Sequence, residues 1–166
     1  LSTVSALAAQ NIGARQVRRA RQTLLDSVVI AVFFGVIFSC AVQFFAPQIV
    51  GIFEKNETVI RLGSQYLKSY VWDCVFAGVH FCFSGYFCAI GRSGLSFLHN
   101  VLSIVLVRVP FAYLASACFA DTLFPMGLAA PGGSLLSVVI CVIAYAVISR
   151  RVSDDSLTRT GASDIL

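Results

Sequence analysis

Long stretches with almost no charged residues constrain this chain more than any other feature of its sequence. Four stretches hold at most one charged side chain each: residues 27–53, 69–91, 93–120 and 122–149. A helix needs about 20 mainly apolar residues to cross the hydrocarbon core of a bilayer, and every stretch is long enough. The apolar runs are continuous rather than alternating, which disfavours the strands of a membrane barrel. The sequence therefore predicts an all-α, polytopic transmembrane helical bundle.

The overall composition supports lipid as the natural solvent of this chain. Only 12% of its residues are charged and 58% are hydrophobic, whereas soluble domains are roughly 25% charged. The net charge of +4 comes from basic residues that gather at the ends of the apolar stretches, as flanking residues of a bilayer do. No nucleic-acid motif and no Cys-x-x-Cys pair occurs. The lipid bilayer is the expected partner, and neither nucleic acid nor a metal ion is expected.

Turn and charge signals divide the chain into helices. Four complete helices are expected at about 24–45, 69–90, 97–119 and 131–149. Residues 1–12 are expected to be the end of a fifth helix, Pro47 to end the first complete one, and residues 59–67 to form a short amphipathic stretch. Residues 1–150 would form a partial transmembrane lobe. Residues 151–166 are rich in Ser, Thr and Asp and are predicted to be a disordered cytoplasmic tail.

The predicted loops alternate in charge along the chain. Residues 15–21 carry four arginines, and the turn between the second and third helices carries Arg92. The loop at 54–57 is acidic, and the loop at 121–127 carries only Asp121. Two further arginines follow the last helix, at 150–151. The positive-inside rule therefore predicts a multi-pass protein of the cell membrane with its arginine loops and C-terminus in the cytoplasm.

Five short motifs occur in order along residues 1–150. They are Ala-Gln-Asn-Ile-Gly-Ala at 9–14 followed by Arg-Ala at 19–20, Tyr-Leu at 66–67, Ala-Ile-Gly-Arg-Ser at 89–93, Arg-Val-Pro-Phe-Ala-Tyr at 108–113 and Met-Gly-Leu at 126–128. Together they resemble the MATE (multidrug and toxic compound extrusion) family. The Arg-Val-Pro motif and the terminal tail favour the C-terminal lobe. The resemblance implies the end of helix eight and helices nine to twelve of a twelve-helix, two-lobe transporter.

The resemblance also implies a function, that of a secondary active efflux transporter and not an enzyme. Members of the family export organic, cationic, drug-like compounds in exchange for Na⁺ or H⁺, by alternating access of two lobes around a central cavity. The expected partners are a small organic substrate and the remaining N-terminal lobe of the same chain. No cofactor is expected apart from the coupling ion.

One position departs from the family pattern. The Na⁺-coupled branch usually has an acidic residue about twelve positions before the glycine turn of helix ten. Counting back from Gly91 gives Val79. The acid of this helix, Asp73, lies almost two turns nearer the opposite end. The resemblance therefore does not carry the helix-ten cation site over to this chain.

Three titratable residues within the apolar stretches are candidates for the substrate or ion pathway: Asp73, His80 and Arg108. A charge inside a membrane costs about 2.5–3.5 kcal/mol on insertion scales, so it usually faces a cavity or a partner. Asp73 and Arg108 are within reach of one another if their helices are antiparallel neighbours. The alternatives are that Asp73 is interfacial and that Arg108 caps carbonyls freed by Pro110. His80 shares a helical face with Asp73 and is either a proton relay or a packing residue.

Other functions remain open from the sequence alone. A lipid-linked saccharide flippase shares the broader fold, but more basic residues within the membrane would favour it. A membrane scaffold subunit without a transport role is a second alternative. A membrane enzyme is disfavoured because no acidic or histidine-rich catalytic cluster is visible.

Overall fold

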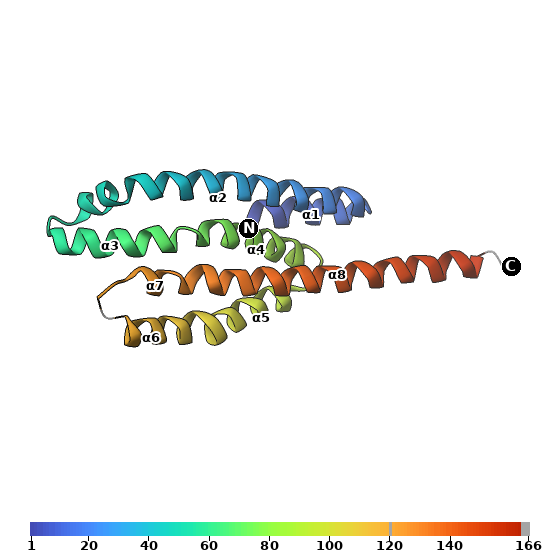
Figure 1. The fold of residues 1–166 in the computed structure, drawn as a ribbon. Coiled ribbons are helices and arrows are strands. Elements are labelled where there is room, and N and C mark those ends of the chain that lie inside the picture. Colours follow the sequence, from blue (N-terminus) through green and yellow to red (C-terminus); the bar gives the residue numbers. More distant parts are fainter. Residues whose placement is uncertain (120, 164–166) are drawn as a thin grey trace.

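The computed structural model describes residues 1–119 and 121–163, with side chains described up to residue 150. Its elements, in chain order, are α1 (Ser2–Gly13), α2 (Val17–Phe53), α3 (Glu57–Tyr70), α4 (Asp73–Ala89), α5 (Ser93–Ser103), a π-helix η1 (Ile104–Arg108), α6 (Val109–Cys118), α7 (Phe124–Gly127) and α8 (Ala129–Ser163). Every element within those described residues is helical (Figure 1). The predicted all-α class is confirmed.

Four helical stretches are long and apolar enough to cross a membrane. They run over Val17–Phe53, Glu57–Ala89, Ser93–Cys118 and Phe124–Arg150. Each contains one of the four predicted helices, so their number and order are confirmed. The exposed face of α2 carries large apolar side chains such as Phe33 and Phe44, which are 60% and 77% exposed. An outer surface of this kind suits contact with lipid.

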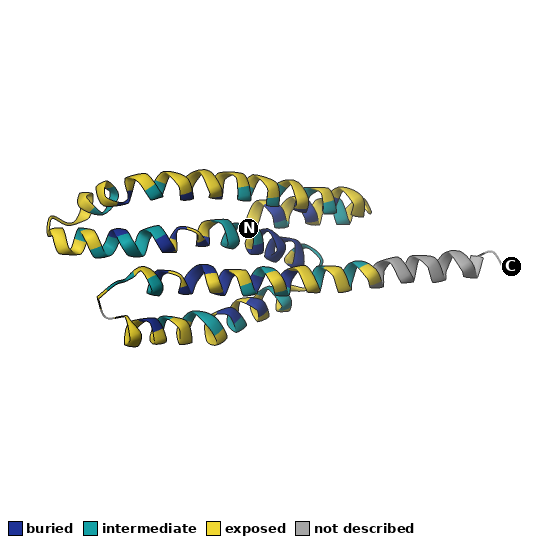
Figure 2. Cartoon of the chain, viewed as in Figure 1, coloured by how far each residue is buried: buried dark blue, intermediate teal, exposed yellow. Residues whose placement is uncertain are grey.

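Helix α4 lies at the centre of the bundle. It contacts α1, α2, α5 and α8, and residues 82–87 in its second half are all buried, dark blue in Figure 2. The core cluster consists of Val4, Ala8, Ala20, Leu24, Cys82, Phe83, Tyr86, Phe87 and Cys141. Small residues allow these helices to approach one another closely, as is usual between membrane helices.

The expected end of the first helix at Pro47 is wrong. Helix α2 continues through Pro47 to Phe53, and Figure 1 shows its last turns bending toward α3. A proline removes one backbone donor and kinks a helix without necessarily ending it. Membrane helices tolerate this because neighbouring helices and side chains satisfy the freed groups.

The predicted amphipathic stretch at 59–67 lies within α3, and the second complete helix, expected from about residue 69, begins at Asp73. A turn at Val71 and Trp72 separates α3 from α4. Polar side chains of α2 bind carbonyl groups at this break: Ser39 Oγ donates to Val71 O at 3.1 Å, and Gln43 Nε2 donates to Lys68 O at 2.8 Å. These bonds satisfy carbonyl groups at a break within one membrane-spanning stretch, where lipid offers no donors.

The turn and tail predictions have different outcomes. Gly91 has a φ of 73°, a left-handed conformation suited to glycine, and the glycine turn before α5 is confirmed. Helix α8 runs to Ser163, well past its expected end near residue 149. The side chains of 151–163 and the whole of 164–166 lie outside the described residues, so a cytoplasmic tail at 151–166 stays a prediction.

Candidate functional site

Asp73, Arg108 and Ser134 form a closed polar triangle between three helical segments. Arg108 Nη2 lies 3.3 Å from Asp73 Oδ1 and donates to Ser134 Oγ at 2.6 Å. Ser134 Oγ in turn donates to Asp73 Oδ1 at 2.5 Å. Asp73 is 7% exposed and Ser134 is fully buried. The meeting of Asp73 and Arg108 across neighbouring helices is therefore confirmed.

Two local irregularities of the backbone position the charged pair. The break after α3 places Asp73 in the first turn of α4, where unpaired backbone N–H groups favour a carboxylate. Arg108 ends the π-helix, in which Val109 N bonds to Ile104 O. The wide turn immediately precedes Pro110, which has no N–H to offer the preceding turn. Both charged residues thus sit where the helices depart from regular geometry.

Arg108 does not act as a cap for the carbonyls near Pro110. The hydrogen bonds of its guanidinium go to Asp73 and Ser134. Its Nε is buried and has no partner among the described residues, so one N–H donor of the guanidinium is unused. The Asp73 carboxylate is buried and paired within the bundle. Its depth in the bilayer, and with it the alternative of an interfacial Asp73, stays a prediction.

Gly133 lets α8 approach the pair closely. A Cβ atom at this position would lie 2.8 Å from Ser103 Oγ and 2.9 Å from Arg108 Nε, both too close for an ordinary contact. Ser103 Oγ also donates to Gly133 O at 2.6 Å. Ser103, Gly133 and Ser134 give no distinctive signal in the sequence, because a small residue in an apolar helix has many packing uses.

His80 meets another histidine rather than Asp73. It is 2% exposed, and its ring lies 5.4 Å from that of His99 on α5. Neither ring nitrogen of His80 has a hydrogen-bond partner among the described residues. His99 Nε2 pairs with Ser84 Oγ at 2.8 Å. His99 lies well inside α5 and is 1% exposed.

Arg108 also lines a cavity of about 220 Å³. Two tyrosines of α3, Tyr66 and Tyr70, line the same space, with Met126 and alanines of α6 and α8. The tyrosine rings are stacked with centroids 5.5 Å apart. An aromatic wall beside a guanidinium offers stacking and donor groups to a planar ligand.

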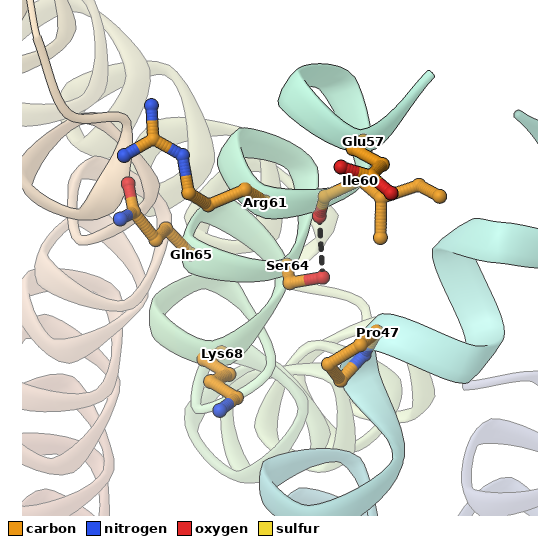
Figure 3. A pocket seen from close by; sticks show the side chains of 7 residues that line it. All are labelled: Pro47, Glu57, Ile60, Arg61, Ser64, Gln65 and Lys68. Carbon is orange, nitrogen blue, oxygen red and sulfur yellow. Dashed lines mark hydrogen bonds between the residues drawn. The ribbon is translucent and has the colours of Figure 1, made fainter. Parts of the chain in front are cut away.

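A larger groove of about 430 Å³ lies at the far ends of α2 and α3. Figure 3 shows its lining: Pro47, Glu57, Ile60, Arg61, Ser64, Gln65 and Lys68. Ser64 Oγ donates to Ile60 O at 2.6 Å, so this serine bonds its own helix. The kink of α2 at Pro47 forms one side of the groove. Its charged residues are exposed or half-buried and form no ion pair with one another among the described residues, so it is the weaker candidate site.

Comparisons with known proteins agree with this architecture. The sequence profile of the MatE family matches residues 1–114. A protein of Shewanella oneidensis described as a FAD transporter is 30% identical over 142 residues, covering 84% of this chain and 30% of that protein. A solved structure described as the inward-facing conformation of a multidrug resistance MATE family transporter of the MOP superfamily superimposes with a TM-score of 0.73 and 19% identity, over 92% of this chain and 35% of that one.

The chain spans about a third of the length of the relatives it matches. The family match covers more than half of the chain, and it includes the first three candidate membrane spans almost entirely. The charged pair of α4 and η1 lies within the matched region. The chain belongs to the MATE family of multi-pass membrane transporters.

Proposed function

We propose that this chain forms part of a secondary active transporter that exports an organic compound in exchange for Na⁺ or H⁺. The observation that carries the proposal is the pairing of the buried Asp73 carboxylate with the half-buried Arg108 guanidinium inside a bundle of this family. Charges within membrane helices are costly, and where they occur they mark substrate or ion pathways. The pair borders a cavity of about 220 Å³ through Arg108, which supports such a pathway.

The proposed mechanism is alternating access by the rocking of two lobes. Transporters of this kind bind their substrates where discontinuous helices meet near the middle of the membrane. The break between α3 and α4 and the π-helix before α6 are such discontinuities, and they hold the two charges. The chain would contribute part of one lobe, and the remainder of the protein would supply the other.

The coupling ion is proposed to act on Asp73. A proton or Na⁺ that reaches this carboxylate would compete with Arg108 and Ser134, which now bind the same oxygen, Oδ1. Loss of the pair would release the Arg108 guanidinium toward the neighbouring cavity. Ion binding at Asp73 would in this way change what Arg108 can bind.

The substrate class has two candidates. The family resemblance favours an organic, drug-like cation. A second candidate is an anionic aromatic compound such as FAD, the cargo named for the Shewanella oneidensis relative. The second is favoured by one observation: Asp73 is neutralised by its partner, while Arg108 and the stacked Tyr66 and Tyr70 line the cavity.

Transport by the complete protein in proteoliposomes tests these proposals. FAD and the cationic dye ethidium would be offered separately, each under an inward Na⁺ gradient and an inward H⁺ gradient. Substrate movement against its gradient under one ion alone supports an exchanger and identifies the ion. Movement of neither compound, together with movement of a fluorescent lipid-linked saccharide, would favour a flippase. Movement of nothing under any gradient would favour a scaffold subunit.

A further inference from the structure

We propose that a second cavity, at the arginine-rich end of the bundle, is a binding site for a phosphate ester. This arginine cavity has a volume of about 260 Å³ and is lined by Arg21, Arg92, Tyr86, Tyr145 and Ser149, with aliphatic side chains completing its wall. It lies at the end of α4 next to the glycine turn, whereas Asp73 lies at the start of that helix. The inference does not depend on the proposed transport function.

The donors of the arginine cavity are those that phosphate prefers. Two guanidinium groups and three hydroxyl groups line it, and no carboxylate does so within the part of the chain whose side chains are described. A guanidinium presents N–H groups in a planar fork that matches phosphate oxygens, and hydroxyl groups add single donors. The two positive charges of this lining favour an anion over a cation.

Arg21 has an unused donor inside the protein. Its Nε is buried and has no hydrogen-bond partner among the described residues. Arg15, Arg18 and Arg19, by contrast, are exposed. A buried donor without a partner is costly, and native structures rarely leave one unsatisfied unless a ligand or ion binds there. The Arg21 guanidinium therefore points to a ligand, whereas its three neighbours only mark the membrane surface.

The walls of the arginine cavity come from elements fixed by the core. Tyr86 is 5% exposed and belongs to the core cluster. Its ring packs edge-on against Tyr145 of α8, with centroids 5.7 Å apart. Helix α4 contacts α1, α2 and α8, and α1 contacts α2. The two hydroxyl groups are consequently held on a rigid scaffold, which lowers the entropy lost when a ligand binds.

The size and position of the arginine cavity restrict the ligand. Sites for drug-sized molecules enclose about 300–1,000 Å³, so this one fits a phosphate group with a small substituent rather than a whole dinucleotide. Two sources supply such a group: the head group of an anionic phospholipid at the membrane surface, and a small soluble phosphate. The shared chemistry is an oxyanion held by Arg21 and Arg92.

Native mass spectrometry of the complete protein, released from detergent, tests the lipid source. Phosphatidylglycerol and the zwitterionic phosphatidylcholine would be titrated in parallel. Equilibrium dialysis with labelled inorganic phosphate tests the soluble source. The variants are Arg21→Gln and Tyr145→Phe, which removes only a hydroxyl group, with Arg18→Gln as the matched control on the same helix. Melting temperatures in detergent establish that each variant is folded.

We expect Arg21→Gln to weaken binding of one probe by roughly tenfold to a hundredfold, the loss of a charged hydrogen bond. Tyr145→Phe is expected to weaken it by about threefold to tenfold, and Arg18→Gln by less than about twofold. If Arg21→Gln loses binding of phosphatidylglycerol alone, the ligand is the lipid head group. If it loses binding of inorganic phosphate, the ligand is the soluble phosphate. The proposal would be overturned if Arg21→Gln bound each probe as tightly as Arg18→Gln does. It would also be overturned if Tyr145→Phe bound the probes as tightly as the unmodified protein.

Discussion

At the scale of single residues, the Asp73 carboxylate is held by two donors that also hold each other. Arg108 and Ser134 both bind Oδ1, and Arg108 binds Ser134. Removing one member of a buried pair leaves the other charge uncompensated, whereas removing both can be nearly neutral. The effects of replacing Asp73 and Arg108 on the free energy of unfolding are thus expected to depend strongly on one another, whether or not the pair also serves transport.

Asp73→Asn is predicted to lower the free energy of unfolding by about 2–4 kcal/mol, less than for a fully buried pair because part of the Arg108 side chain is exposed. Arg108→Gln is predicted to cost a similar amount. The double variant should cost less than the sum of the two, and melting in detergent measures this coupling. If transport by the folded Asp73→Asn protein were unchanged, Asp73 would have no part in the mechanism.

His80 is a residue whose burial contributes little to stability. Its two ring nitrogens lack partners among the described residues, so His80→Leu is predicted to leave the melting temperature unchanged or to raise it, since it removes unsatisfied polar atoms. His99→Leu is the matched control. It breaks the bond to Ser84 and is expected to destabilise the protein by about 1 kcal/mol. A drop in stability with His80→Leu would show that the ring has an unseen partner.

Some residue-scale features were accessible from the sequence and others were not. Asp73 and Arg108 were predicted to meet because each is a lone charge in an apolar stretch, and their helices follow one another. Ser134 was missed because a serine in a membrane helix carries no distinctive pattern. The partner of His80 was missed because its direction depends on how α4 is rotated against α5, which hydrophobicity alone does not fix.

At the scale of elements, the number and order of the helices follow from hydrophobic length, but their interruptions do not. The break at Val71–Trp72 depends on side chains from α2, in particular Ser39 and Gln43. These contacts are distant in sequence. The continuation of α2 beyond Pro47 likewise depends on packing against α3. The sequence shows where a residue disfavours a helix, but tertiary contacts decide whether the helix ends there.

Gly133→Ala is predicted to destabilise the packing of α8 by about 1–3 kcal/mol, the usual cost of overpacking. The added Cβ would clash with Ser103 and with Arg108, so the Asp73 pair should weaken as well. Gly132→Ala is the matched control, because its Cβ would lie 3.6 Å from the nearest atom, in Val107. Alanine there should be neutral or slightly stabilising, through helix propensity. Equal melting temperatures for the two variants would contradict the close approach at Gly133.

At the scale of the whole molecule, the two ends of the bundle differ in chemistry. One end carries Arg15–Arg21, the glycine turn with Arg92, and Arg150. The opposite end carries the acidic loop before α3 and Asp121 before α7. The short loops alternate between basic and acidic from one membrane crossing to the next, and the positive-inside rule reads this alternation of charge. It predicts one orientation for the whole bundle, and the arginine cavity would then face the cytoplasm.

Cysteine labelling in intact cells tests that orientation. In a version of the complete protein freed of its native cysteines, Arg18→Cys and Gly94→Cys probe the arginine-rich end, and Lys55→Cys and Asp121→Cys probe the other; all four positions are exposed. A membrane-impermeant maleimide is expected to label positions 55 and 121 in intact cells, and 18 and 94 only after permeabilisation. The reverse pattern would refute the orientation while keeping the four crossings. Labelling of 18 and 55 from the same side would refute the crossing by α2 itself, because these two positions lie at its opposite ends.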